Sequence, residues 1–328
     1  MTAKTQSLAA SLTAGDRRAL ARAVTLVEST RADHRAEAVA LLDAVRGRGQ
    51  SLRIGLSGTP GVGKSSFIES FGSMLVDQGL RVAVLAVDPS SARSGGSILG
   101  DKTRMERLSR RAEAFIRPSP SATHLGGVAR RTRDAVVLCE AAGFDIVLVE
   151  TVGVGQSETM VAQMCDLFVL LLAPAGGDEL QGVKRGIMEM ADLILVNKAD
   201  GDLRAAANRT VADYAGALRL LRKRPQDPEG FPKALAVSAL HEDGLQDAWE
   251  EMRALEAWRR ETGWWEKTRS AQAVHWFEEE VREGLLAQLR APQVAARMAK
   301  LGQQVADGSL SAEDAAVQIL RHGRKETP

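Results

Sequence analysis

An apolar run at residues 52–56 leads directly into a glycine-rich loop, and a helical pattern follows the loop. The loop consists of Gly58, Thr59, Pro60, Gly61, Val62, Gly63, Lys64, Ser65 and Ser66. It matches the phosphate-binding loop G-x-x-x-x-G-K-[ST] in the strand-to-helix context that this pattern requires. Backbone N–H groups can turn toward phosphate oxygens, Lys64 can reach the β and γ phosphates, and the Ser65 hydroxyl can ligate Mg²⁺. The loop therefore predicts a nucleotide-binding domain.

Short, continuously apolar runs recur along the middle of the chain, at residues 52–56, 82–87, 146–149, 167–172, 193–196 and 234–237. Continuous runs of this kind are typical of strands buried on both faces of a parallel sheet. The segments between them are long enough for crossover helices. We therefore predict an α/β domain with a doubly wound, mainly parallel sheet over residues 51–250.

Both ends of the chain have helical patterns. Apolar residues recur at helical intervals over residues 7–46, and from Glu250 onward the sequence reads as helices broken near Gly263, Pro292 and Asp307. Ser311 and Asp314 have the spacing of a capping box. The predicted division is an N-terminal helical segment (1–50), a P-loop domain (51–250) and a C-terminal helical segment (251–328), whose helices after residue 255 we expect to hold a dimer.

Charge and hydropathy exclude several classes of protein. The 328 residues include 43 Lys and Arg against 42 Asp and Glu, a net charge of +1 that argues against a polyanion-binding surface. The longest apolar run, residues 167–175, falls well short of the ~20 residues that span a bilayer. The first thirty residues lack the apolar stretch of a secretory signal. We expect a cytoplasmic protein whose two cysteines, Cys139 and Cys165, are small core residues.

Three acidic residues are candidates for the metal site. Asp88 and Glu150 each end a predicted strand, and Asp101 lies in a polar, glycine-rich loop. The carboxyl ends of parallel strands share one edge of the sheet with the phosphate-binding loop. Asp88 and Glu150 should therefore face the metal, although an acid at a strand end can instead cap a helix or lie in a solvated turn.

The choice of base is indicated by Asn197-Lys198-Ala199-Asp200, the N-K-x-D pattern of guanine-nucleotide proteins. The Asp200 carboxylate can accept two N–H donors from the Watson–Crick edge of guanine, whereas adenine presents a lone pair there. A bidentate contact of this kind discriminates by roughly 1–3 kcal/mol. After the next strand, Ser238, Ala239 and Leu240 resemble the backbone segment that contacts guanine O6. The order and spacing of these motifs predict a guanine-nucleotide site.

Residues 150–153, Glu-Thr-Val-Gly, occupy the place of the D-x-x-G motif, whose glycine (here Gly153) senses the γ-phosphate. Val154 stands where Ras-like proteins place the glutamine that orients the attacking water, so we expect slow intrinsic hydrolysis. Gln156 could compensate or simply face solvent. The loops at residues 90–104 and 175–185 are either ordinary connections or segments ordered by the γ-phosphate. All five tryptophans fall between Trp249 and Trp276, which suits either a core or an association surface.

Together these motifs resemble the MeaB/ArgK family, which includes the methylmalonic aciduria type A protein. Five stretches carry the resemblance: residues 58–66, 87–105, 116–120, 150–158 and 176–186. The resemblance covers roughly residues 10–325. It implies a homodimeric GTPase of the signal-recognition/MinD/BioD-like class that chaperones adenosylcobalamin-dependent methylmalonyl-CoA mutase, gates cofactor loading and protects the mutase from inactivation.

The resemblance also implies roles for individual residues. It assigns the loop 58–66, Gly153, Asn197, Lys198, Asp200, Ser238, Ala239 and Leu240 to binding of GTP or GDP. It assigns Ser65, Asp88, Asp101 and Glu150 to Mg²⁺, and Lys64, Asp101 and Glu150 to hydrolysis. A third switch around residues 177–184 would signal to the mutase through Gln181 and Lys184.

Other functions remain as alternatives. A nickel-inserting metallochaperone GTPase needs a His/Cys storage cluster, and the five scattered histidines and two cysteines offer no such spacing. A protein-targeting GTPase needs a Met-rich basic domain, whereas the nine methionines here are dispersed in a neutral chain. A kinase associated with amino-acid transport would need a phosphoacceptor protein, and phosphate transfer to such a protein would distinguish it from a GTP-dependent chaperone.

Overall fold

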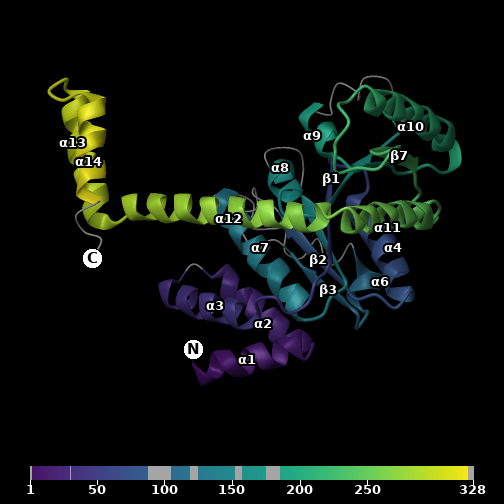
Figure 1. Cartoon of the computed structure of the whole chain (residues 1–328), viewed down its shortest axis with the longest axis horizontal. Coiled ribbons are helices and arrows are strands. Elements are labelled where there is room, and N and C mark those ends of the chain that lie inside the picture. Colours follow the sequence, from purple (N-terminus) through teal and green to yellow (C-terminus); the bar gives the residue numbers. More distant parts are fainter. Residues whose placement is uncertain are drawn as a thin grey trace. The chain divides into compact units, whose positions relative to one another are not determined.

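The computed structural model describes residues 2–29, 31–87, 105–118, 125–151, 157–174 and 185–323 (Figure 1). The chain forms two compact units, Met1–Ser270 and Ala271–Pro328. The predicted division at residues 50 and 250 follows changes in sequence pattern rather than compactness, and it stays a prediction.

A seven-stranded sheet is the centre of the first unit, with the strand order β3-β2-β4-β1-β5-β6-β7 and parallel pairing throughout. The strands are β1 (Leu52–Gly58), β2 (Val82–Val87), β3 (Ala114–Arg117), β4 (Ile146–Thr151), β5 (Leu167–Leu172), β6 (Leu193–Val196) and β7 (Lys233–Ala236). The prediction of a doubly wound parallel α/β fold is confirmed.

The burial of the strands explains why the sequence pattern located six of them. Every residue of β1, β2, β4, β5 and β6 is buried, so each reads as an apolar run. The edge strand β7 is half-buried along its length. The sequence analysis did not predict β3, because its apolar run is only three residues long before Arg117.

Helices connect the strands and cover the sheet (Figure 1). In chain order they are α4 (Lys64–Asp77), α6 (Glu106–Ser109), α7 (Leu125–Ala141), α8 (Ser157–Ala162), α9 (Arg185–Met190), α10 (Arg204–Arg219) and α11 (Leu245–Glu261). In the core beneath α4, Phe67 stacks on Phe71 with ring centroids 5.1 Å apart, and Phe71 meets the edge of Trp249 from α11 at 6.0 Å. Cys139 and Cys165 are both buried and unbridged, and burial raises the pKa of each thiol.

The N-terminal helical pattern forms α1 (Ala3–Thr13), α2 (Arg17–Glu28) and α3 (Ala32–Val45). These helices pack on one another and on α7 (Figure 1). Leu12, Leu20 and Val24 are fully buried there. The segment is therefore part of the first compact unit.

The C-terminal residues form α12 (Trp264–Leu289), α13 (Pro292–Ala306) and α14 (Ala312–Gly323). The predicted breaks are present, since Gly263 adopts φ +75° before α12 and Pro292 begins α13. The Ser311 hydroxyl accepts the Asp314 N–H at 3.0 Å, so the predicted cap of α14 also forms. Within the second unit, Leu301, Ala315 and Ile319 make a small apolar cluster between α13 and α14.

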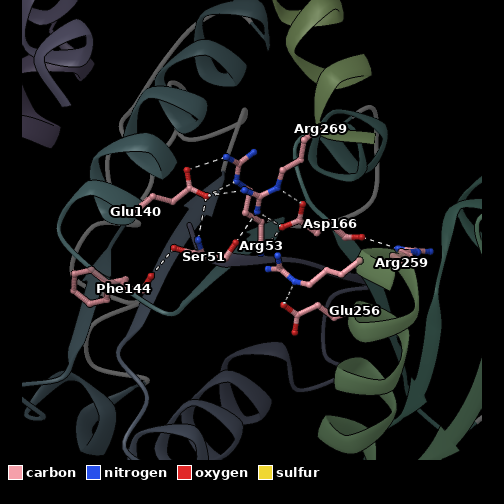
Figure 2. Close-up of polar contacts among 9 residues, drawn as sticks. Ser51, Arg53, Glu140, Phe144, Asp166, Glu256, Arg259 and Arg269 are labelled. Carbon is pink, nitrogen blue, oxygen red and sulfur yellow. Dashed lines mark hydrogen bonds and ion pairs between the residues drawn. The ribbon is translucent and has the colours of Figure 1, made fainter. Parts of the chain in front are cut away.

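A buried network of ion pairs (Figure 2) lies at the amino ends of the strands, since Arg53 is the second residue of β1 and Asp166 directly precedes β5, whereas the glycine-rich loop follows the carboxyl end of β1. Arg53 of β1 donates to Glu140 of α7 through Nε at 2.9 Å and Nη2 at 2.8 Å. Asp166, just before β5, accepts from the Arg53 backbone N–H at 2.9 Å and from Arg269 Nη2 at 2.7 Å. Because Arg269 belongs to α12, this network ties the first turns of that helix to the sheet.

Arg259 of α11 extends the network to the next strand. It donates to the Asp166 carbonyl oxygen and to the carboxylates of Asp192 and Asp227, each at 2.6 Å. Arg224 also pairs with Asp192, at 2.7 Å. The carboxyl pKa of Asp192 is lowered, because the attraction of Arg259 and Arg224 outweighs the penalty of burial. Asp192 therefore remains ionised at neutral pH.

Candidate functional site

The glycine-rich loop runs from the last residue of β1 to the first turn of α4, as its pattern requires. A Cβ at Gly58 would lie 2.3 Å from the carbonyl oxygen of Leu171, and one at Gly63 would lie 2.7 Å from Asn197 Nδ2. Gly63 also has φ +90°, a conformation that L side chains rarely adopt. Only glycine fits at these two positions, so the loop can lie close to β5 and to the N-K-x-D segment.

Lys64 lies across the loop. Its ammonium donates to the carbonyl oxygens of Gly58 at 2.6 Å and Thr59 at 3.3 Å. Burial lowers the pKa of Lys64, and the nearby carboxylates of Glu150 and Glu158 partly oppose that shift. The amine is thus positioned where phosphate oxygens can replace the two carbonyl acceptors.

Asn197 and Lys198 connect the end of β6 to the glycine-rich loop. Asn197 Nδ2 donates to the Val62 carbonyl at 2.9 Å, and its Oδ1 accepts the Ala239 N–H at 3.0 Å. Lys198, in the left-handed region at φ +61°, donates to the Gly61 carbonyl at 2.7 Å. Three segments that are distant in the sequence are therefore held together by two side chains.

Asp200 and the segment 238–240 lie together beyond Asn197. The Ser238 hydroxyl donates to the Asp200 carboxylate and also accepts the His241 N–H at 3.1 Å. Ser238 and Asp243 exchange two backbone hydrogen bonds, which closes the turn. Leu240 in this turn is 79% exposed. The carboxylate and the turn are arranged so that they could contact one edge of a base.

Glu150 and Ser65 are the described candidates for the metal site. Glu150 is buried near the end of β4 and pairs in register with Leu56 of β1. The next residue, Thr151, has its hydroxyl 3.5 Å from the Leu56 carbonyl oxygen and 3.1 Å from the Ser57 hydroxyl oxygen. Ser65 is in the first turn of α4. Carboxylate and hydroxyl oxygens are hard donors that suit Mg²⁺.

Several predicted site residues lie outside the described residues: Asp88, Asp101, Gly153, Val154, Gln156, Gln181 and Lys184. Within the described ranges, no group of three or more His, Cys, Asp or Glu residues could hold a metal ion. The described part of the site therefore comprises the glycine-rich loop, Glu150, the N-K-x-D segment and residues 238–240.

Glu158 is one residue near the site to which the sequence analysis assigned no role. It lies in the first turn of α8, is fully buried, and attracts the Lys64 ammonium electrostatically. The sequence held a signal for this role, because Glu158 ends the stretch 150–158 and an acid in the first turn of a helix after a nucleotide motif can lie near the bound phosphates.

The parallel sheet, the phosphate-binding loop and the N-K-x-D segment in contact with it define a P-loop GTPase. Comparison with known proteins makes this assignment specific. The family model for methylmalonyl-CoA mutase-associated GTPase MeaB matches residues 20–294, and the chain belongs to this family. It binds guanine nucleotides and is a GTP-hydrolysing enzyme.

Relatives match over nearly the whole chain. A putative GTPase of Caulobacter vibrioides is 52% identical, with 96% of each chain covered. The mouse protein named methylmalonic aciduria type A homolog, mitochondrial, is 48% identical over 94% of this chain and 77% of its own length. The crystal structure named LAO/AO transport system kinase is 36% identical and covers 99% of both chains with a TM-score of 0.76. The family resemblance and the fold expected from the sequence are both confirmed.

A membrane-crossing helix needs a long apolar stretch. Among the described residues, no helix is both long and apolar enough for that.

Proposed function

We propose that this GTPase is a chaperone of an adenosylcobalamin-dependent methylmalonyl-CoA mutase, which gates cofactor loading and protects the mutase from inactivation. The observation that carries the proposal is the match of the mutase-associated GTPase family to residues 20–294. The 48% identity to a methylmalonic aciduria type A homolog supports it. Action in the cytoplasm stays a prediction.

Within the proposed site, the amides of residues 58–66 and the Lys64 ammonium bind the phosphates. Asp200 accepts hydrogen bonds from guanine, and the turn 238–240 contacts its O6. Asn197 and Lys198 position these parts, because their side chains bond to the glycine-rich loop. Gly153, outside the described residues, is proposed to contact the γ-phosphate.

The proposed Mg²⁺ ligands are Ser65, Asp88, Asp101 and Glu150, either directly or through water. Of these, Ser65 and Glu150 are among the described residues, and both offer oxygen donors at the phosphate edge. Bound Mg²⁺ would neutralise charge on the β and γ phosphates. Lys64 would stabilise the same charge, and Asp101 and Glu150 would hold the hydrolytic water and the metal in place.

We predict that Asp200→Asn lowers the preference for GTP over ATP by about 10-fold or more, because one acceptor becomes a donor that faces a guanine donor. The measurement is displacement of labelled GDP by GTP and by ATP. Asp202→Asn, an exposed change two residues away, is the matched control. If ATP already displaces GDP from the unmodified protein as well as GTP does, Asp200 does not select guanine.

The chaperone proposal is tested by hydrolysis with and without purified mutase. Alone, the protein should hydrolyse GTP at about 10⁻⁴ to 10⁻² s⁻¹, because Val154 replaces the water-orienting glutamine. Mutase should accelerate hydrolysis, and the nucleotide bound to the GTPase should in turn change its affinity for the mutase.

Lys184→Ala should keep basal hydrolysis and lose most of the acceleration by the mutase. Full acceleration of that variant would remove the switch role from Lys184, and no acceleration by any mutase would refute the chaperone function.

We also propose that the protein acts as a homodimer through α12. Four large apolar residues of this helix, Val274, Phe277, Val281 and Leu285, are between 47% and 67% exposed. Their spacing of three and four residues places them on one face of the helix. A stripe of this kind is typical of a helix that packs against a partner.

We predict that Phe277→Glu with Leu285→Glu converts the dimer to a monomer in light scattering, because two charges would have to be buried in the interface. Glu283→Lys, on the opposite face of α12, is the control and should leave the dimer intact. A doubly substituted protein that remained dimeric would place the interface elsewhere.

A transport-associated kinase is the second candidate, since the LAO/AO transport system kinase structure has the same fold at 36% identity. Labelled GTP and a purified amino-acid-binding protein separate the two functions. A kinase would transfer the γ-phosphate to that protein, whereas a chaperone would release it as inorganic phosphate. A metallochaperone role has less support, because the described residues hold no cluster of metal-binding side chains.

A further inference from the structure

A cavity of about 800 Å³ lies among α1, α2, α3 and α7, and its lining includes no residue of the glycine-rich loop or of the N-K-x-D segment. We call it the N-terminal pocket. Its lining includes the basic side chains of Lys4, Arg22, Arg31 and Arg131 and the apolar side chains of Leu8 and Leu26. The volume is within the range of small-molecule sites, and the mixture of apolar walls with a few polar groups is typical of them.

Arg131 of α7 is the unusual residue of this pocket. It is only 8% exposed, yet it makes no hydrogen bond or ion pair with the described residues, and its buried Nε has no acceptor. Burial lowers the pKa of Arg131, the neighbouring charge of Arg130 adds to that effect, and the Glu28 carboxylate partly opposes it without a hydrogen bond to Arg131. Glu28 is therefore near Arg131 but is not hydrogen-bonded to it, and a buried arginine without a hydrogen-bonded acid is costly to the fold.

The acids of the pocket are already engaged. Glu28 accepts hydrogen bonds from Arg117, including one from Nε at 3.1 Å. Glu37 lies 3.7 Å from the Lys4 ammonium. Arg31 pairs with Asp33 at 2.7 Å. Arg22 and Arg131 are therefore left without a bonded carboxylate among the described residues.

A bound water molecule would not neutralise the positive charge of Arg131. Arg131 also borders a cavity of about 10 Å³, which Glu28, Leu85 and Thr132 line as well. That space is about enough for one water molecule, which can accept a hydrogen bond but carries no charge. The larger of these two cavities, the N-terminal pocket, has room for a neutralising group.

We propose that the N-terminal pocket binds a small organic anion, whose phosphate or carboxylate group is held by Arg131 and Arg22 while its apolar body lies against Leu8 and Leu26. Arg131 provides a planar donor set that suits such a group.

Phenyl phosphate is a suitable probe, because it joins a phosphate to an apolar ring. Calorimetric titration would use the full chain saturated with GDP and Mg²⁺, so that the glycine-rich loop is occupied. We expect one further molecule to bind, and Arg131→Met to weaken its binding by about 10-fold or more, as loss of a charged hydrogen bond does. Arg22→Gln should weaken it less, and Arg48→Gln, at an exposed loop position, should leave it unchanged. Benzoate tested in parallel separates a carboxylate from a phosphate site.

Thermal unfolding of the ligand-free protein gives a second readout. If Arg131 is kept for an anion, Arg131→Met should raise the melting temperature while it abolishes binding, because an uncompensated charge is removed. A large fall in the melting temperature would show that Arg131 has a structural partner and would overturn the proposal. The same conclusion follows if phenyl phosphate and benzoate do not bind at millimolar concentration, or if Arg131→Met binds them as well as the unmodified protein does.

Discussion

Replacement of Lys64 by alanine should lower the rate of GTP hydrolysis by about 100-fold or more, the usual effect of removing one group that stabilises developing charge. The ammonium is already held at the loop by the Gly58 and Thr59 carbonyls. It is therefore preorganised near the phosphates and needs little rearrangement to meet them. GTP affinity should fall as well, because the lysine also contacts the bound nucleotide.

Single-turnover hydrolysis measured at saturating GTP separates the two effects. Lys300→Ala, at an exposed position of α13, is the control and should behave as the unmodified protein. Circular dichroism should show an unchanged fold, since Lys64 is not part of the core. Hydrolysis within a few-fold of the unmodified rate would mean that Lys64 does not contact the transferred phosphate.

The sequence predicted the parts of this protein that are determined locally. The glycine-rich loop requires its own backbone geometry, and β1, β2, β4, β5 and β6 are buried on both faces, so their composition alone identifies them. The capping box at Ser311 depends on two residues three positions apart. The N-K-x-D segment was recognisable because its order after the loop is itself informative.

Features that depend on distant residues could not be predicted. The four-residue strand β3 is defined by pairing with β2 rather than by its composition. Nothing in the sequence around Asn197 shows that its side chain bonds to both Val62 and Ala239. From the sequence alone, Arg131 would be expected on the exposed face of a helix, and only the structure shows that it is buried.

The buried ion-pair network at the amino ends of the strands is the largest of these unpredicted features. Arg259 connects Asp166, Asp192 and Asp227 within it. We predict that Arg259→Ala lowers the free energy of unfolding by about 3–5 kcal/mol, the usual cost of removing one partner from a buried pair. It would leave the carboxylates of Asp192 and Asp227, whose side chains are 6% and 2% exposed, with Arg224 as their arginine partner among the described residues. It would also remove the hydrogen bond to the Asp166 carbonyl.

Urea unfolding at pH 7 measures this loss, and Arg253→Ala is the matched control on the same helix. The Arg253 side chain is 59% exposed and its pair with Glu256 is 3.6 Å long, so its loss should cost about 0–1 kcal/mol. Equal effects of the two substitutions would show that the buried network contributes no more than a surface pair.

The pH dependence of the Arg259→Ala effect tests the mechanism. Because the folded pKa of Asp192 is depressed, its pairing stabilises the fold above the unfolded value of about 3.9 and is lost as pH falls through the folded value. The difference in free energy of unfolding between the unmodified protein and Arg259→Ala should therefore shrink in acid, because a protonated Asp192 carries no charge for Arg259 to stabilise. A difference that stayed constant down to pH 3 would assign the cost to lost packing of the long side chain instead of to the charge on Asp192.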